Sequence, residues 1–246
     1  MSRKLFEEEH LIFRDSFRKF LEHEVIPCMA KWEEDGIVPV EVWKKMGENG
    51  FLCPWMEEKY GGVGAGFEYS VIINEEIFRA GATGLAVGLH SDVTVPYIHS
   101  FGTEEQRMRW LPGCASGDVI TCIAMTEPNA GSDLAAIRTR AVRDGDEYVI
   151  NGQKIFISGG INSNLAVVAV KTDPKAVPPT EGISLVCVEY GTPGFSKGRK
   201  HKKMGLHSQD TPELFFEDCR IPGSNLFHLC SWAGVPLPAA CFVCFL

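Results

Sequence analysis

The chain has 246 residues and a formal net charge of −8, which allows one or two domains with cores of ordinary size. The acidic balance argues against a dedicated nucleic-acid-binding protein. No secretory signal or transit peptide is recognised at the start, so a cytoplasmic location is expected, or the mitochondrial matrix in a eukaryote. The nine cysteines are too irregularly spaced for a disulfide framework. Six lie within apolar runs and are expected to be buried thiols: Cys28, Cys53, Cys114, Cys122, Cys187 and Cys219.

The first part of the chain has the hydrophobic periodicity of helices. Apolar residues recur at three- and four-residue steps from Phe6 to about Asp35, and Pro27 is expected to kink or interrupt this helix. A second helix is expected to open at Val38-Pro39 and to end near Gly50.

Further helices are predicted over 67–80 and 84–101, the second almost wholly apolar and therefore buried. Thr103 to Gln106 matches a capping box that starts a short helix, with Pro112 as its stop. These elements predict an all-α N-terminal domain over about residues 1–117.

A glycine-rich loop, 53–66, lies between the predicted helices. Its glycines could expose backbone amides to a phosphate group. However, no P-loop lysine with a following serine or threonine is present, and the dinucleotide-binding spacing is not met. A tight crossing between helices is the favoured interpretation.

From Val119 the pattern changes to strands. The apolar run from Val119 to Met125 predicts a buried strand, and the small and polar residues from Thr126 to Asp133 predict a loop whose amides can approach a ligand. Alternating runs then predict an antiparallel meander with turns at Asp144-Gly145 and Asn151-Gly152. Later strands are predicted over 165–170, 182–190 and 211–218. The fold class is therefore α+β, with an antiparallel β-barrel or sandwich over about 118–225.

A dense basic run extends from Lys197 to Lys203. It could face nucleic acid, but no aromatic residues are interleaved with the positive charges. A solvated loop is the favoured interpretation.

Two of these motifs together resemble a known family. Ala124-Met-Thr-Glu-Pro-Asn-Ala-Gly-Ser-Asp133, followed by Asn151-Gly-Gln-Lys-Ile-Phe-Ile-Ser158, is similar to the middle domain of the acyl-CoA dehydrogenases. The resemblance extends from about Phe6 to about Asn225 and is closest to the long-chain and isovaleryl-type branches. It implies an FAD-dependent oxidation of an acyl-CoA to the trans-2-enoyl-CoA, with electrons passing to an electron-transfer flavoprotein. Members of the family are homo-oligomers.

The resemblance also implies residues that contact the flavin. Without it, Thr126 and Ser132 would be interpreted as turn residues and Phe156 as a core residue. With it, the loop after the first strand lies against the flavin ring and the ribityl chain, and the second motif covers one face of the ring. The implied cofactor-binding residues are Ile123, Ala124, Met125, Thr126, Gly131, Ser132, Phe156, Ile157 and Ser158.

Substrate-binding residues follow from the same resemblance. Ser132 would also contact the pantetheine of CoA, and His90, Ser91 and Thr94 would line the acyl chain. A histidine on an apolar helix face can equally be a hydrogen-bonded core residue. The further pair Ser208 and Thr211 matches a serine and a threonine of the family that support this neighbourhood.

No residue of the sequence matches the family's catalytic base. That glutamate lies in a C-terminal helical bundle, which also supplies much of the oligomer interface and which this sequence does not contain. Glu127 is expected to be a structural hydrogen-bonding residue instead. The chain is therefore expected to be inactive or impaired as an enzyme. The alternatives are a non-catalytic binding or regulatory partner of full-length homologues and a membrane-tethered fragment.

The last segment, 226–246, contains no charged residue and is unlike the family. Its length would just span a bilayer, but glycine and prolines interrupt it and no positive flank is present. Cys241 and Cys244 have the spacing of a metal-ligand pair without a second pair. A foreign tail is the favoured interpretation, ahead of a membrane or partner-binding segment. No metal, nucleic-acid or membrane partner is expected.

Overall fold

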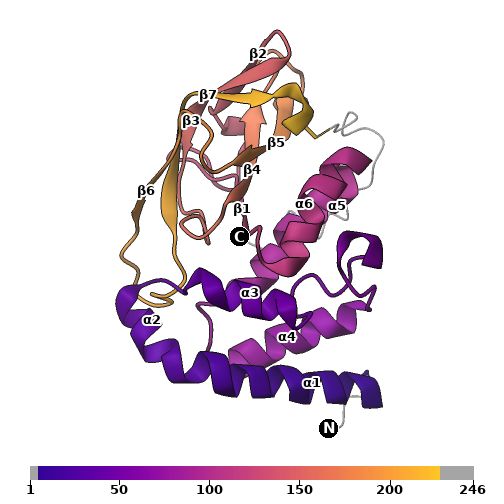
Figure 1. The fold of residues 1–246 in the computed structure, drawn as a ribbon. Helices are drawn as coiled ribbons and strands as arrows, with labels where there is room; N and C mark the ends of the chain where they lie inside the picture. Colours follow the sequence, from indigo (N-terminus) through magenta and orange to yellow (C-terminus); the bar gives the residue numbers. More distant parts are fainter. Residues whose placement is uncertain (1–4, 228–246) are drawn as a thin grey trace.

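The structure, a computed structural model, describes residues 5–227. Figure 1 shows a group of helices followed by a curved sheet that stands over it. The chain opens with α1 (Glu8–Phe20), a π-helical turn (Leu21–Val25), a 3₁₀ turn (Ile26–Cys28) and α2 (Met29–Asp35). The predicted interruption around Pro27 is therefore confirmed, because the chain loses α-helical geometry where proline cannot donate a hydrogen bond.

The next helices follow their sequence signals closely. Helix α3 (Val40–Glu48) begins after Pro39, and Gly50 takes a left-handed φ of 71° beyond its end. Helix α4 (Phe67–Ala80) has the predicted bounds. Between them, residues 53–66 form a loop with one 3₁₀ turn, Glu58–Tyr60.

The helix predicted over 84–101 starts later than expected. Residues 81–86 form turns, and the helix consists of a π-helical segment (Leu89–Thr94) continued by α5 (Val95–Phe101). Gly81 ends α4 with a φ of 71°. A Cβ atom at Gly84 would overlap the side chain of Ser208, so this turn is the place where a loop of the β domain approaches the helices.

Helix α6 (Glu104–Ser116) corrects one prediction. The capping box is confirmed, because the Thr103 hydroxyl accepts from the Gln106 amide and the Gln106 side chain accepts from the Thr103 amide. Pro112 does not end the helix, which continues to Gly117, where φ is 79°. The turn after the proline carries buried Cys114 and Ala115, so packing outweighs the missing backbone hydrogen bond.

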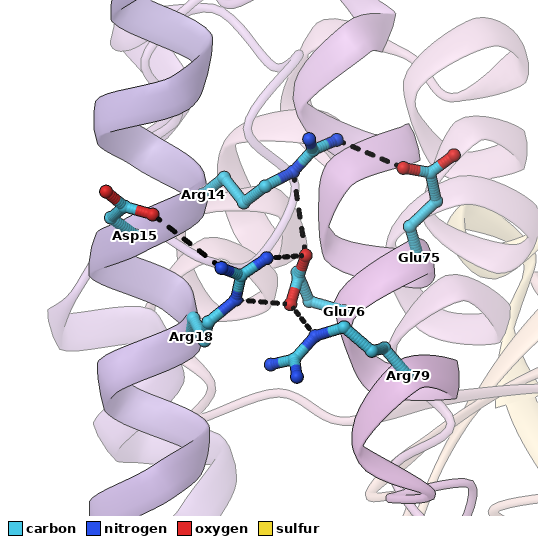
Figure 2. A network of polar contacts seen from close by, with 6 residues as sticks. All are labelled: Arg14, Asp15, Arg18, Glu75, Glu76 and Arg79. Atoms are coloured by element: carbon cyan, nitrogen blue, oxygen red, sulfur yellow. Dashed lines mark hydrogen bonds and ion pairs between the residues drawn. The ribbon is translucent and has the colours of Figure 1, made fainter. Parts of the chain in front are cut away.

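A buried carboxylate joins α1 to α4 (Figure 2). The carboxylate of Glu76 is 4% exposed and accepts two bonds from Arg18, at 2.9 and 2.8 Å, and a further bond from Arg79. Arg14 lies 3.5 Å from the same carboxylate and donates to Glu75 at 3.0 Å. Because a buried carboxylate is costly without positive partners, this cluster fixes how the two helices pack.

Seven strands form one open, curved sheet in the described residues. The strands are β1 (Thr121–Ala124), β2 (Arg140–Asp144), β3 (Glu147–Lys154), β4 (Leu165–Lys171), β5 (Ile183–Glu189), β6 (Phe195–Lys200) and β7 (Pro212–Pro222). Their order is β1-β4-β2-β3-β7-β6, with β5 on the other side of β4. The predicted α+β class is confirmed, but the sheet is mixed, because β1 and β4 run parallel. It is a half-barrel and not a closed barrel.

The predicted turn at Asn151-Gly152 is wrong. Strand β3 runs through both residues, and its register with β7 shifts between Ile150 and Gly152, which marks a β-bulge. Gly152 has a φ of 153°, and a Cβ atom there would lie 2.7 Å from Cα of Thr139. Glycine is therefore required here, because the strand bends at the bulge and the backbone of Thr139 lies close by. The turn at Asp144-Gly145 is confirmed as the link between β2 and β3.

The basic run is not a solvated loop. Its first residues belong to β6, and two of its lysines, Lys197 and Lys200, bind main-chain carbonyl groups of other segments. Lys197 Nζ donates to the carbonyl of Ile161 at 2.8 Å and to that of Ser163, and Lys200 Nζ donates to the carbonyls of Asp35 and Gly36. These two lysines hold turns of the chain together, whereas Arg199 and Lys202 of the run are exposed.

One hydrophobic cluster belongs to both domains. It contains Trp110 and Leu111 of α6, Val167 of β4 and Phe227 after β7. Two other clusters lie within the helices and within the sheet. The side chain of Gln106 adds hydrogen bonds to the carbonyls of Ser224 at 2.7 Å and Leu226 at 3.0 Å. The two domains therefore share part of their core.

The cysteine prediction holds for five residues and is wrong for Cys28, which is exposed on the 3₁₀ turn at the surface. Burial raises the pKa of Cys53 to about 12 and that of Cys122 to about 11, which keeps these thiols protonated. No helix within residues 5–227 is long and apolar enough to cross a membrane. The interpretations of residues 228–246 lie outside the described residues.

Candidate functional site

The loop after β1 is the centre of the candidate site. Ile123 and Ala124 lie on β1 and pair with Val167 and Val168 of β4. The chain then turns outward, and the backbones of Glu127 and Ala130 bond each other at 2.8 and 3.1 Å. Beyond them, the residues from Gly131 to Asp133 are exposed. The buried strand therefore delivers a tightly turned, accessible loop to one edge of the sheet.

Glu127 is confirmed as a structural hydrogen-bonding residue. It is 5% exposed, and its carboxylate accepts from the amides of Arg138 at 2.6 Å and Thr139 at 2.9 Å. Lys154 Nζ donates a third bond to the same carboxylate at 2.9 Å. Burial alone would raise the pKa of Glu127, but these donors outweigh it and hold the pKa below its ordinary value. Glu127 is therefore an ionised anchor for the loop.

Phe156 has the geometry of a ligand platform. Its side chain is 60% exposed, although its backbone has a φ of 59°, which costs free energy in a residue with a bulky side chain. The ring of His201 supports it, with ring centroids 4.9 Å apart. An exposed aromatic ring held in a strained conformation on a folded support is typical of a binding surface. The interpretation of Phe156 as a core residue is excluded.

Three hydroxyl groups lie on the two motif segments, two on the loop after β1 and one on the segment of Phe156. Thr126 and Ser158 are partly exposed, and Ser132 is exposed. Within residues 5–227 none of these hydroxyls has a hydrogen-bond partner in the protein. They are consequently available as donors and acceptors to a ligand. The amide of Ile155 donates to the carbonyl of Thr126 at 2.9 Å, so the two motifs separated in the sequence lie side by side.

The turn after Phe156 is hydrogen-bonded to Pro212, at the start of β7, and to Asp210, just before it. The amide of Ile157 donates to the carbonyl of Pro212, and the amide of Ile161 donates to the Asp210 carboxylate at 2.7 Å. Burial raises the pKa of Asp210 in spite of the amides of Ile161 and Asn162 and of Lys197 nearby. Ile157 itself is buried, and its side chain belongs to the core of the sheet. Its predicted contact with a cofactor would therefore come from its backbone.

The residues predicted to line the acyl chain lie in the π-helical segment. His90, Ser91 and Thr94 are all buried, and each has a partner in the protein. His90 lies 2.9 Å from the Thr121 hydroxyl and 3.1 Å from the carbonyl of Cys114, and burial lowers its pKa to about 4. The Ser91 hydroxyl accepts from the Cys53 amide at 3.1 Å. These are the surroundings of core residues, and their contact with a substrate stays a prediction.

Ser208 and Thr211 belong to the connection between β6 and β7. The carboxylate of Glu33 on α2 accepts from the Ser208 amide at 3.0 Å, from its hydroxyl and from the His207 amide at 3.0 Å. These donors lower the pKa of Glu33, the Ser208 hydroxyl most strongly. Figure 1 shows this connection reaching down to α2. Ser208 therefore joins the sheet to the helices, whereas the Thr211 hydroxyl accepts from Lys203 Nζ at 3.1 Å within the connection itself.

Several supporting residues were missed by sequence reasoning. Lys154 stands within the recognised motif, but its burial depends on Glu127, 27 residues earlier in the chain. Glu33 meets a partner 175 residues later, and no local pattern marks such a pair. Within residues 5–227 no group of three or more histidine, cysteine or acidic side chains could hold a metal ion.

Comparison with known proteins identifies the family. The model of the acyl-CoA dehydrogenase N-terminal domain matches residues 7–118, and that of the middle domain matches residues 122–219. The chain therefore belongs to the acyl-CoA dehydrogenase family.

Individual relatives agree with this assignment. The long-chain specific acyl-CoA dehydrogenase of Sus scrofa mitochondria is 47% identical over 224 residues, which cover 91% of this chain and 52% of the relative. An acyl-CoA dehydrogenase crystal structure from Geobacillus kaustophilus has a TM-score of 0.90 and 58% identity, covering 92% of this chain and 60% of that one. A glutaryl-CoA dehydrogenase from Mycobacterium smegmatis in complex with FADH2 has a TM-score of 0.85 at 30% identity, covering 94% and 58%. The chain thus spans about half the length of its relatives.

Proposed function

We propose that the candidate site is the flavin side of an FAD-dependent acyl-CoA dehydrogenase, which oxidises an acyl-CoA to the trans-2-enoyl-CoA. The observation that carries the proposal is the exposed Phe156 ring, held in a left-handed backbone beside the loop after β1. These two segments together carry three available hydroxyls, two on the loop and one at Ser158. A flat ring system with polar edges fits such a surface, because the aromatic face takes the ring and the hydroxyls take its edge. The relative crystallised with FADH2 supports the choice of cofactor.

The chain's own residues would bind and orient. Phe156 would cover one face of the isoalloxazine, and the hydroxyls of Thr126 and Ser158 would bond its edge. Gly131 and Ser132, at the exposed end of the loop, would contact the ribityl chain and the pantetheine of the substrate. Bound FAD would supply the hydride acceptor. The protein's contribution here is to hold the ring in one orientation and to shield one face from water.

No residue of this chain is assigned as the base that removes the α-proton. Glu127 lies within the loop, but its oxygens are already bonded to two amides and an ammonium group. The 246-residue chain is accordingly expected to bind flavin with little or no turnover of acyl-CoA. In an active enzyme of this type an electron-transfer flavoprotein would accept the electrons.

The test is retention of FAD after incubation and desalting, measured from the visible absorption band. About one flavin per folded chain is expected. In Phe156→Asn, the asparagine tolerates the left-handed backbone, so the free energy of unfolding should stay within about 1 kcal/mol of wild type while retention falls at least about tenfold. Phe78→Asn is the control, because Phe78 is equally exposed on α4, at 69%. A folded wild-type chain without flavin, or equal losses in both variants, would overturn the proposal.

A further inference from the structure

Two consecutive residues at the end of β3 hold three consecutive residues of the candidate flavin loop. Lys154 Nζ donates to the carbonyl of Met125 at 3.0 Å and to the carboxylate of Glu127 at 2.9 Å. The amide of Ile155 donates to the carbonyl of Thr126, which lies between them, at 2.9 Å. Phe156 follows directly in the sequence. The aromatic ring of Phe156 therefore lies one residue after Ile155 and two residues after Lys154, the two residues that fix the loop.

The carboxylate of Glu127 also closes the far end of the loop. Its two oxygens take the amides of Arg138 and Thr139, which lie 11 and 12 residues later. The exposed residues from Gly131 to Asp133 thus extend from a loop whose two ends meet at one charged group. The Thr139 hydroxyl donates to the carbonyl of Gln153 at 3.5 Å. The far end of the loop is therefore also bonded to the end of β3.

The pair is deeply buried. The side chain of Lys154 is 0% exposed and that of Glu127 is 3% exposed. Replacing a buried ion pair by apolar residues often leaves stability unchanged or improved, so such a pair is weakly explained by stability alone. Its directional bonds, in contrast, specify one arrangement of the segments that they join.

We propose that Lys154 and Glu127 are positioning residues that hold the Thr126 loop and the Phe156 platform at one fixed separation, so that a flavin ring meets both at once. This inference rests on the proposed function. It assigns two different roles: Thr126 and Phe156 contact the cofactor, and the buried pair behind them sets the distance between them. Loss of the pair would loosen the loop, although the residues proposed to contact the flavin would be unchanged.

The experiment compares Lys154→Met, Lys154→Arg and the double variant Lys154→Met/Glu127→Gln with wild type. In the double variant no uncompensated charge is buried, and the glutamine oxygen still accepts an amide bond, so this variant keeps the fold when the single one does not. Lys197→Met is the matched control. Lys197 is a half-buried lysine that also binds main-chain carbonyls, but those belong to the turn containing Ile161 and Ser163.

Two readouts are needed. Amide hydrogen exchange reports the order of the loop without any cofactor, and the FAD dissociation constant and visible spectrum report its consequence. In the double variant, exchange of residues 126–132 and 155–158 should accelerate by at least about tenfold, and FAD affinity should fall by a similar factor with a changed band shape. Lys154→Arg should restore part of the affinity. Lys197→Met should accelerate exchange in 159–163 and change FAD affinity less than about threefold.

The outcomes separate this inference from the proposed function. Unchanged loop exchange in a folded double variant overturns the positioning role whether or not flavin binds. Equal losses of affinity in the double variant and in Lys197→Met also overturn it, because they would reflect general destabilisation. If wild type retains no flavin, the proposed function fails for this chain, and selective loosening of 126–132 and 155–158 would still establish that the pair orders the loop.

Discussion

Individual residues in this structure achieve their roles through the groups around them. Phe156 is exposed because its strained backbone turns it away from the core, whereas His90 is buried although histidine is often a surface residue. His90 packs edge-on against Trp43, with ring centroids 5.5 Å apart. Both ring nitrogens of His90 have partners, the Thr121 hydroxyl and the Cys114 carbonyl. A neutral imidazole satisfies both partners, so charging it in place would be costly.

His90 should therefore make the fold sensitive to mild acid. Its pKa is about 4 in the folded chain, below its ordinary value of 6.5, so the unfolded state takes up the proton first. Stability from this residue is complete above about pH 6.5 and is lost as the pH falls towards 4, by up to about 3 kcal/mol. His90→Gln keeps a donor and an acceptor and should flatten this part of the dependence.

The measurement is urea unfolding at several values between pH 7 and pH 4.5. The exposed His23→Gln variant controls for loss of a histidine at the surface. An unchanged slope in His90→Gln would mean that other groups cause the acid sensitivity.

At the scale of elements, local signals were sufficient where a pattern needed no distant partner. The bounds of α4 and the capping box at Thr103 could be predicted because glycine termination and side-chain capping act within a few residues. Asn151-Gly152 was misread because the same dipeptide suits a hairpin turn and a bulge. Pairing with β7 selects the bulge, because β7 is hydrogen-bonded to β3 on both sides of it.

The candidate site divides in the same way. The exposed loop and the Phe156 segment could be located from their motifs, since a short segment of sequence carries each of them. Their supports could not be located, because Lys154, Glu33 and Asp210 find their partners through the folded sheet. Pro112 shows the converse case, in which packing of a helix overrides a strong local stop signal.

The bulge in β3 yields a prediction at this scale. Gly152→Ala would place a methyl group against the backbone of Thr139 and force alanine to a φ of 153°, so we expect a loss of about 2 to 3 kcal/mol in the free energy of unfolding. Gly145→Ala is the control, because its φ is 62° and the space around it is open. That variant should lose about 1 kcal/mol. Equal losses in chemical denaturation would contradict the close approach at the bulge.

At the scale of the whole molecule, the two domains are joined by charged and apolar contacts together. Glu33 binds the connection between β6 and β7, Lys200 binds the end of α2, and the side-chain Nδ2 of Asn162 donates to the carbonyl of Val38 at 2.7 Å. The shared hydrophobic cluster lies between α6 and the sheet. Because side chains of both domains fill this cluster, helices and sheet should unfold as one cooperative unit.

Glu33→Ala should weaken this connection. The substitution removes the acceptor of two amides and one hydroxyl, and Glu33 is partly exposed, so we expect a loss of about 1 to 2 kcal/mol. Hydrogen exchange should accelerate around Ser208 before it accelerates in β3. The neighbouring Glu34→Ala, on the exposed side of α2, should leave both quantities unchanged. Equal effects of the two variants would contradict a specific role for Glu33.

The shared cluster has a consequence for synthesis on the ribosome. The side chain of Gln106 can form its bond to the carbonyl of Leu226 only after another 120 residues have been synthesised. Phe227 then packs into the same cluster. At about 5 to 20 residues per second this interval lasts roughly 6 to 24 s. The helices that emerge first therefore keep an apolar face open to water and to chaperones for that time. Leu165, Val167 and Leu185 of the sheet join the cluster first, and Phe227, which follows β7, joins it later.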